Sequence, residues 1–427
     1  MKRFLCCLLC GCMTLGLLTG CGNAENKNNA TGADSKTDDR QGTAEQGGTE
    51  EAENIVIWHD GDEGIMDTIA HCVNEELKDE NIQVTFEKKS GLTDQLQLYG
   101  NDEANGPDMY FYAHDSLGML VEMGILAPIT DVISESDEAD LLPMTVKAGT
   151  YQDTQYMLPV YFETLLFMYN KDLWEGDVPS TTEDLYAYME AHTDTAAGTY
   201  AVVNQHSTAY NVSPFIHGFG GYIINEDAQP GLNLQETKDA ITYNQKFAAL
   251  QADGDYNTVT TLFNDGKAAA IIGGPWLVTG IKEAGIDLGI KSLSEFTLPN
   301  GEKLAPYSGV QGVGVMKYAA ENKKDAIASV LKVLAGEQVG TALAVNASCA
   351  PANQKSYEDE QVSANEMISA MKITAETAQP MPNIPQMSVM WGPAESLLAA
   401  VNKSGEDVDE AAEKYQQEAE SAIADMQ

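Results

Sequence analysis

Short apolar runs alternate with amphipathic stretches in the first part of the folded region. Residues 55–58 form an apolar run typical of a buried strand, 82–86 alternate apolar and polar positions, and 109–112 form a third candidate strand. A helix is expected after the first strand, because apolar side chains recur at a spacing of four: Ile65, Ile69, Val73 and Leu77. With another helix at 117–123, strands and helices alternate, which favours an α/β fold with helices covering a parallel sheet.

Two segments in the middle of the chain do not fit a single strand or helix. The run at 157–169 is long, poor in β-branched residues, and changes character around Glu163. The stretch at 308–315 alternates glycine with β-branched and polar residues. Hinges need a few positions that absorb backbone rotation, so both segments are predicted to cross between two halves of the molecule.

The remaining patterns predict further helices and a buried strand. Ser180 and Glu183 have the spacing of a capping box that opens a helix over 185–191. Another helix is expected at 236–250 and a strand at 267–272. A closing helix has its apolar side chains on one face: Val408, Ala411, Tyr415, Ala419, Ala422 and Ile423.

Length and charge narrow the function classes. The chain has 427 residues, which suggests two domains, and its 43% hydrophobic residues suffice for two cores. With 24 Lys and Arg against 65 Asp and Glu, the net charge is −41. Such a field repels phosphate backbones and anionic headgroups, so neither nucleic-acid binding nor electrostatic attachment to a membrane is expected.

The N-terminus has the features of an export signal. A basic start is followed by a short apolar run, which predicts a signal peptide over 1–20. The run ends in Leu18-Thr19-Gly20-Cys21, which resembles a bacterial lipobox and makes Cys21 the expected lipid attachment site. An ordinary secretory signal would leave Cys21 as a free thiol. Residues 21–53 lack large apolar side chains, so they are predicted to form a flexible tether.

The sequence lacks the usual marks of an enzyme or a metal site. It contains no GxxxxGK, HExxH or GxSxG motif, and none of its six histidines pairs with another at i, i+4. We therefore expect no catalytic residue, no cofactor and no metal. Within the folded region only Cys72 and Cys349 remain, either as two buried free thiols or as one disulfide.

Five short segments in the folded region have distinctive compositions. They are GPDMYFYAHD at 106–115, YNKDL at 169–173, FNDG at 263–266, GPW at 274–276 and MPNIPQMS at 381–388. In sequence and in spacing they resemble the maltose- and maltodextrin-binding protein family, the extracytoplasmic sugar-binding subunits of ABC transporters. The last segment is long and compositionally odd, so agreement by chance is remote. The resemblance covers essentially everything after the tether.

The resemblance implies an α/β, two-lobed fold of the periplasmic-binding-protein type. Each lobe would be a mixed sheet flanked by helices, with the ligand cleft between the lobes. The implied division of the chain is 54–161 and 314–360 for lobe 1, 166–305 and 367–427 for lobe 2, and hinge crossings at 162–165, 306–313 and 361–366. The residue pattern by itself indicates the first two crossings, whereas the third comes from the resemblance alone.

A pyranose needs two kinds of protein surface. Its C–H face packs on aromatic rings, and its hydroxyls donate to carboxylates or bond to amides. The ligand-binding residues that the resemblance implies are Asp62, Glu63, Tyr112, Asp115, Glu163, Tyr210, Tyr256, Trp276, Met381 and Trp391. Among these, Tyr210, Trp276 and Trp391 would stack from the second lobe, while Tyr256 would lie at its rim.

Other roles are open to several of these residues. Each aromatic residue could instead pack in a core. Asp62 could cap the helix from Glu63 while also binding the ligand, and Asp115 could likewise be a cap. Trp58 and Trp174 are expected to be structural.

Some positions depart from the family pattern, and these departures concern the substrate. The maltose-binding pattern has Lys at the position of Glu63, Arg at Ser116, Glu at Thr208 and Arg at Glu395, and Tyr112 replaces a Trp. Three cationic donors are therefore lost while the stacking residues remain. Linear α-glucans are the first expectation, another neutral oligosaccharide competes with them, and anionic sugars are disfavoured.

The predicted function is capture of a neutral oligosaccharide, most simply maltose or a maltooligosaccharide, by closure of the lobes and its delivery to an ABC permease. The protein is expected to be a monomer on the extracellular face of the cell membrane, held there only by its lipid. The alternatives are a lipid-anchored glycosidase that uses two of Asp62, Asp115 and Glu163, and a surface lipoprotein that binds a macromolecule through its acidic face. Within the binding class, the sequence does not separate transport from ligand delivery to a chemoreceptor or sensor kinase.

Overall fold

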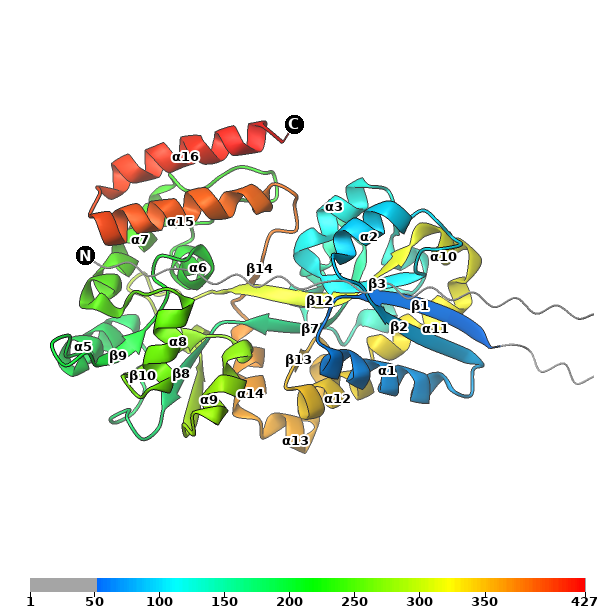
Figure 1. The fold of residues 1–427 in the computed structure, drawn as a ribbon, viewed down its shortest axis with the longest axis horizontal. Helices are drawn as coiled ribbons and strands as arrows, with labels where there is room; N and C mark the ends of the chain where they lie inside the picture. Colours follow the sequence, from blue (N-terminus) through cyan, green and yellow to red (C-terminus); the bar gives the residue numbers. More distant parts are fainter. Residues whose placement is uncertain (1–51, 427) are drawn as a thin grey trace, which may run out of the picture. The chain divides into compact units, whose positions relative to one another are not determined.

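The computed structural model describes residues 52–426. The predicted signal peptide, the lipid site Cys21 and the tether as far as residue 51 lie outside the described residues. Within them, the fold consists of two mixed sheets with helices packed around each (Figure 1).

The larger sheet has the order β13-β7-β12-β3-β1-β2, with β4 and β14 paired to β12. Its strands are β1 (Glu53–His59), β2 (Ile82–Lys88), β3 (Met109–Ala113), β4 (Leu126–Ala127), β7 (Met157–Thr164), β12 (Tyr307–Met316), β13 (Ala350–Pro351) and β14 (Gln379–Pro380). β1 is parallel to β2 and β3, whereas β12 runs antiparallel to both β3 and β7. The expectation of a purely parallel sheet is therefore wrong, and the mixed sheet implied by the resemblance is present.

The smaller sheet has the order β11-β8-β10-β9. Its strands are β8 (Leu166–Asn170), β9 (Tyr200–Val203), β10 (Ala268–Gly273) and β11 (Leu288–Ser292). β9 and β10 are parallel, and β8 is antiparallel to β10 and β11. A separate hairpin joins β5 (Thr150–Tyr151) to β6 (Thr154–Gln155).

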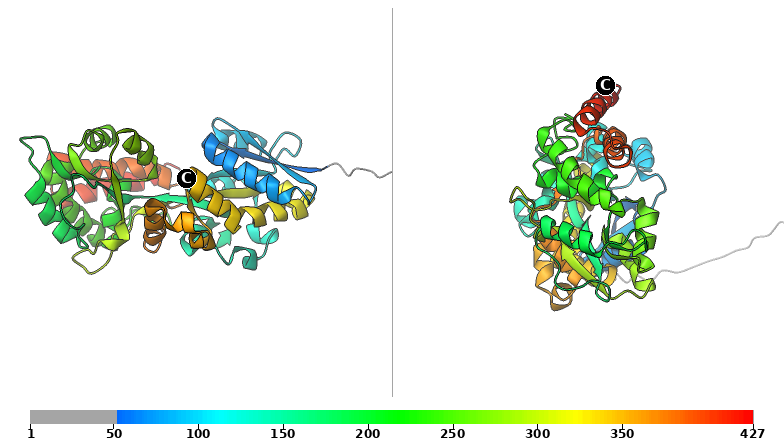
Figure 2. Two further views of the ribbon diagram at one scale, coloured as in Figure 1. Left: turned by 90° about the horizontal axis from the view of Figure 1, so that it is seen from below. Right: turned by 90° about the vertical axis from the view of Figure 1, so that its left-hand side faces the viewer.

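One group of helices lies around the larger sheet and another around the smaller one (Figures 1 and 2). The first group is α1 (Glu63–Leu77), α2 (Leu92–Tyr99), α3 (Leu117–Glu122), α4 (Pro143–Ala148), α10 (Lys317–Asn322), α11 (Lys324–Leu334), α12 (Glu337–Ala347) and α13 (Glu360–Ser363). The second is α5 (Thr182–His192), α6 (Ala209–Gly218), α7 (Gln235–Phe247), α8 (Tyr256–Asn264), α9 (Val278–Glu283), α14 (Glu366–Thr374), α15 (Met387–Ser404) and α16 (Val408–Ala424). Among the described residues, no single helix is long and apolar enough to cross a membrane, although the bent pair α11 and α12 meets the length and composition criteria.

Two helix starts test the local sequence signals. The Asp62 carboxylate caps α1 by accepting from the backbone N–H groups of Gly64 at 2.9 Å and Ile65 at 3.3 Å, as predicted. The predicted capping box at Ser180 and Glu183 is wrong. Thr181 is the N-cap of α5, and its hydroxyl accepts from the Asp184 N–H at 3.0 Å, so the N-cap lies one residue later than the pattern indicated.

Two chain segments join the sheets. β7 ends at Thr164 and β8 begins at Leu166, so a single residue separates a strand of the larger sheet from a strand of the smaller one. β12 returns beside β7, with a bulge between Gln311 and Gly312. Gly312 is required there, since a Cβ would lie 2.3 Å from the Leu158 carbonyl oxygen. Close backbone packing therefore fixes the register of these two strands where the sheets meet.

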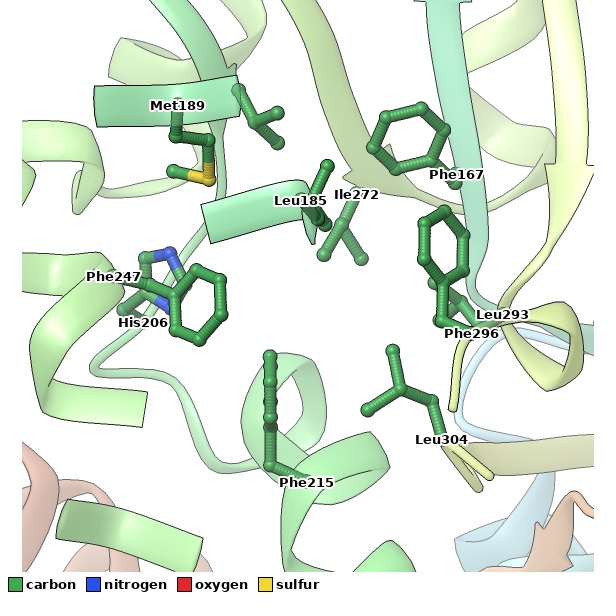
Figure 3. A pocket seen from close by; sticks show the side chains of 11 residues that line it. Phe167, Leu185, Met189, His206, Phe215, Phe247, Ile272, Leu293, Phe296 and Leu304 are labelled. Carbon is green, nitrogen blue, oxygen red and sulfur yellow. The ribbon is translucent and has the colours of Figure 1, made fainter. Parts of the chain in front are cut away.

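The core under the smaller sheet is almost fully packed. Figure 3 shows Phe167, Phe215 and Phe296 pointing toward a common centre, where a void of about 10 Å³ remains. Such a void is about the smallest that holds one water, and its lining here is apolar. Trp58 and Trp174 are 4% and 7% exposed, in agreement with the structural role predicted for them.

Both cysteines of the described region are free. Cys349 is buried, whereas Cys72 is only half-buried on α1, so the expectation of two buried thiols holds for one of them. The alternative of a disulfide between them is wrong. Burial raises the pKa of the Cys349 thiol to about 12, with smaller contributions from the charges of Glu163 and Asp62. The thiol is therefore protonated and unreactive at neutral pH.

Candidate functional site

Trp276 is a large apolar side chain left 44% exposed by the fold. It follows β10 in a short 3-10 helix (Pro275–Leu277), and its ring folds back over Gly274. A Cβ at Gly274 would lie 2.1 Å from Cζ3 of the indole, so only glycine leaves room for this ring position. The Gly-Pro-Trp motif thus has a local reason: it sets an exposed indole against the backbone.

Trp276 is one end of a row of four rings. Its centroid is 6.3 Å from that of Tyr210 in the first turn of α6, and Tyr210 is 6.3 Å from Tyr307 at the start of β12. Tyr307 in turn lies 6.2 Å from Trp391 on α15. We call Trp276, Tyr210, Tyr307 and Trp391 the aromatic row. The structure therefore brings the three predicted stacking residues together through Tyr307, which the sequence did not single out.

Tyr307 differs from the other three rings because it is 2% exposed. The His217 ring also packs on its edge at 4.5 Å. Burial lowers the pKa of His217 to about 4, so this imidazole is neutral at neutral pH. Tyr307 thus supports Tyr210 and Trp391 from beneath, and its position in a buried strand gives no sequence signal for that role.

Glu163 lies on β7 directly opposite Gly309 of β12, beside the row. Its carboxyl is half-buried, and burial raises its pKa. Burial also raises the pKa of the Tyr210 hydroxyl, and the Glu163 charge adds to that shift, which shows that the two groups are neighbours. Met381 is close as well, since its Cε would lie 3.8 Å from a Cβ on Gly309. Glu163, Tyr210 and Met381 therefore lie around one stretch of β12.

Further carboxylates gather where β1 and β3 end. These strands are parallel neighbours, so their carboxyl ends meet at the same edge of the sheet. Asp60 and Asp62 follow β1, while Tyr112 and Asp115 lie at and after the end of β3. Tyr112 is half-buried, and burial raises its pKa, with smaller effects from Asp60 and Asp115. We call Asp60, Asp62, Asp115 and Glu163 the acidic group.

Asp60 was missed in the sequence, although a usable signal existed. It is the first residue after β1, at the carboxyl end of a parallel strand, which is where ligands bind in open α/β sheets. Burial raises its pKa, while the nearby Tyr112 hydroxyl is among the smaller effects that lower it. Tyr112, which stands where the family has Trp, thus has a hydroxyl that interacts with an acid of the site.

Tyr161 and Cys349 lie near more than one member of the acidic group. Burial raises the pKa of the Tyr161 hydroxyl, and the charges of Glu163, Asp62 and Asp60 raise it further. Glu163 and Asp62 act on Cys349 in the same way. Glu163 on β7 and Asp62 at the start of α1 therefore share one neighbourhood.

Two predicted residues are less well connected. Glu63 points into solvent, with its side chain 80% exposed and its carboxylate 3.6 Å from the Lys88 ammonium. Tyr256 is 45% exposed at the start of α8, and no ring contact within the described region links it to Trp276. Their role at the site remains a prediction.

The described residues also contain a groove of about 1070 Å³ that shares Tyr307 and Met381 with the candidate site. Of the predicted site residues it is lined only by Met381, together with Tyr307, His217 and segments near 146–153 and 220–227. A Lys147–Glu226 ion pair of 3.2 Å joins its two sides. No group of three His, Cys, Asp or Glu side chains in residues 52–426 is arranged to hold a metal ion.

Comparisons with known proteins give a consistent result. Residues 73–370 match the bacterial extracellular solute-binding protein family. The maltotriose-binding protein of Pyrococcus abyssi is 28% identical over 87% of this chain and 83% of its own length. The galactooligosaccharide-binding protein of Bacillus subtilis is 28% identical over 86% of this chain and 89% of its own. A cyclo/maltodextrin-binding protein in complex with maltotetraose superposes with a TM-score of 0.77 and 25% identity, over 86% of this chain and 96% of that one.

Proposed function

The chain belongs to the bacterial extracellular solute-binding protein family, and from that premise we propose that it captures a neutral oligosaccharide for an ABC importer. The sugar would lie between the aromatic row and the acidic group. The observation that carries this proposal is the row of rings from the exposed Trp276 through Tyr210 and Tyr307 to Trp391, with the Glu163 carboxylate near Tyr210.

The chemistry of the two groups fits a pyranose. Rings pack against its C–H face, and ionised carboxylates accept strong hydrogen bonds from its hydroxyls. Hydroxyl donors would also compensate the burial of the Asp60 and Glu163 carboxyl groups. An anionic sugar would be repelled by these carboxylates, and the matched positions Ser116, Thr208 and Glu395 carry no positive charge. A neutral glycan is therefore the favoured ligand.

Linear α-glucans are the first candidate within that class. The relative from Pyrococcus abyssi is named for maltotriose, and the superposed structure holds maltotetraose. The relative from Bacillus subtilis is named for galactooligosaccharide, which supports a second neutral oligosaccharide as the alternative. The stacking residues would accept either sugar, whereas the hydroxyl partners would distinguish them.

Closure of the lobes would couple binding to transport. Lobe 1 would comprise 54–161 and 314–360, lobe 2 would comprise 166–305 and 367–427, and the three crossings would act as hinges. A ligand shifts such an equilibrium only through contacts that it makes preferentially in the closed form. The acidic group lies mainly on the larger sheet and the stacking rings lie on elements of the smaller sheet, so one sugar that touches both would favour closure.

Export and lipidation at Cys21 would hold this monomeric protein on the extracellular face of the membrane, near its permease. The family is extracellular, which supports the location, and the Leu18-Thr19-Gly20-Cys21 motif supports the anchor. Two acyl chains bury enough methylene groups for a durable attachment.

The test is isothermal titration of the purified protein with maltooligosaccharides and galactooligosaccharides of two to six sugar units. Saturable binding of a neutral glycan, with its chain length unchanged in a product assay after long incubation, is the expected result. No binding across the panel would refute the proposal. Shortening of the glycan would instead favour a glycosidase that uses the same carboxylates.

A further inference from the structure

His114 is a fully buried side chain that lies between segments of the candidate site. Its ring is not exposed to the surface on which a ligand would bind. His114 is 0% exposed and opens the short 3-10 helix (His114–Ser116) that follows β3. Asp115, an exposed member of the acidic group, is the next residue. The His114 ring points away from that surface, because both of its nitrogens bond to the backbone of distant segments.

The two hydrogen bonds fix the state of the ring. The backbone N–H of Val310 donates to Nδ1 at 3.1 Å, so Nδ1 carries no proton. Nε2 lies 2.9 Å from the Met381 carbonyl oxygen and must therefore be the protonated nitrogen that donates to it. Burial lowers the pKa of His114, which agrees with a neutral ring at neutral pH.

The Val310 bond extends a strand ladder by a side chain. β12 pairs with β3 as far as Gln311 and Ala113, where β3 ends. The next N–H of β12, that of Val310, bonds to the imidazole of the next residue of the other chain segment, His114. Val310 also adjoins Gly309, the partner of Glu163. One bond thus ties the turn that carries Asp115 to the strand beside Glu163.

The Met381 bond reaches the segment that leads to Trp391. Met381 is held from the other side as well, since its N–H donates to the Ser308 carbonyl of β12 at 3.1 Å. Two residues later, the Asn383 carbonyl accepts from the Gly118 N–H at 2.9 Å. Gly118 is needed there, because a Cβ would lie 2.4 Å from that oxygen. α15 begins soon afterwards and carries Trp391 in its first turns.

We propose that His114 is a positioning residue for the sugar site: its two ring nitrogens set the spacing between the turn of Asp115, the strand beside Glu163 and the segment leading to Trp391. This inference rests on the proposed function. His114 does not touch the sugar. It acts by holding members of the acidic group and of the aromatic row in one geometry, which is the condition for a single pyranose to contact both.

The test uses substitutions that separate the two bonds. In His114→Asn the amide oxygen can replace Nδ1 as the acceptor for Val310, but the side chain no longer reaches Met381. In His114→Gln the amide nitrogen can replace Nε2, whereas the acceptor for Val310 is lost. His114→Leu removes both. We expect each amide variant to weaken glycan binding roughly 10-fold and His114→Leu to weaken it further.

A matched control separates positioning from stability. Leu331→Ala opens a cavity at a fully buried position of α11, away from the site, and should lower the melting temperature while leaving affinity unchanged. A wild-type measurement needs no variant: ¹⁵N shifts of the imidazole should report the Nε2–H tautomer at neutral pH.

The outcomes distinguish the two proposals. Wild-type affinity in all three His114 variants, an affinity loss in Leu331→Ala equal to theirs, or an Nδ1–H tautomer would overturn the positioning role and leave the proposed function intact. A wild-type protein that binds no glycan would overturn the proposed function itself.

Discussion

The aromatic row and the acidic group meet at one place but are built in opposite ways. The rings of the row support one another, with each neighbouring pair of centroids 6.2 to 6.3 Å apart. The acidic group instead gathers four carboxyl groups, and burial raises the pKa of Asp60 and of Glu163. The rings of the row thus already pack on one another, whereas Asp62 is partnered as a helix cap and burial alone shifts the pKa of Glu163. The difference indicates a ligand that offers both a flat apolar face and several hydroxyl donors.

Removing the row should have the largest effect on binding. We expect the double variant Trp276→Ala, Trp391→Ala to lose at least about 100-fold in glycan affinity, since each indole buries up to about 250 Å² of surface on contact. Trp276 is 44% exposed and Trp391 is half-buried against Tyr307, so Trp276→Ala alone should lower the melting temperature less than Trp391→Ala alone. Titration calorimetry measures the affinity. Val345→Ala, at an exposed apolar position on α12, is the control, and equal affinity in both proteins would contradict the account.

Removing the charge of Glu163 should have the second-largest effect on glycan binding. Glu163→Gln should weaken binding roughly 10- to 100-fold, because a hydrogen bond to a charged group is worth about 1.5–3 kcal/mol. The unliganded variant should nevertheless be more stable than wild type at neutral pH. The folded-state pKa of Glu163 is raised above its ordinary value of 4.5, so the native protein loses stability as pH rises through that interval. Calorimetric melting tests this, and a lower melting temperature for Glu163→Gln would contradict it.

The pH dependence of binding should follow the same carboxyl. A protonated Glu163 accepts fewer hydroxyl bonds, so wild-type affinity should fall as pH is lowered through its raised pKa, by at most about tenfold per pH unit. Glu163→Gln should show a flatter profile over that range. Parallel profiles for the two proteins would assign the pH dependence to another group.

Asp62→Asn should have the smallest effect on glycan affinity. This substitution distinguishes the role of Asp62 as a helix cap from its role as a ligand-binding residue. Asp62→Asn keeps an acceptor for the N–H groups of Gly64 and Ile65, so the cap of α1 and the melting temperature should be preserved. Loss of the charge should weaken glycan binding by roughly 3- to 10-fold. An unchanged affinity would leave Asp62 as a helix cap only.

The sequence predicted the strands and helices best where periodicity was strong. β1, β2, α1 and α16 lie where their patterns indicated, because each buries one well-defined face. The predicted capping residue of α5 was wrong by one position, since Ser180 and Thr181 are both good caps and tertiary context chose between them. The mixed sheets could not be derived from the alternation of strands and helices, because the direction of β12 depends on where a distant segment returns.

The candidate site was predicted less completely than the fold. Motifs with a local cause could be found, such as Gly274-Pro275-Trp276, where the glycine makes room for the ring. Tyr307 and His114 could not, because their importance comes from contacts with residues far away in the chain, such as Trp391 and Met381. Asp60 was not predicted but could have been, since it directly follows a parallel strand, where ligands commonly bind.

The central claim is that one neutral sugar is held by both groups at once, so that the lobes close around it. Small-angle scattering of the wild-type protein during titration with maltotriose tests this most directly, with intrinsic tryptophan fluorescence followed on the same samples. The account predicts a saturable fall in the radius of gyration that coincides with the fluorescence change and is absent in the Trp276→Ala, Trp391→Ala variant. Saturable binding with an unchanged radius of gyration would contradict it.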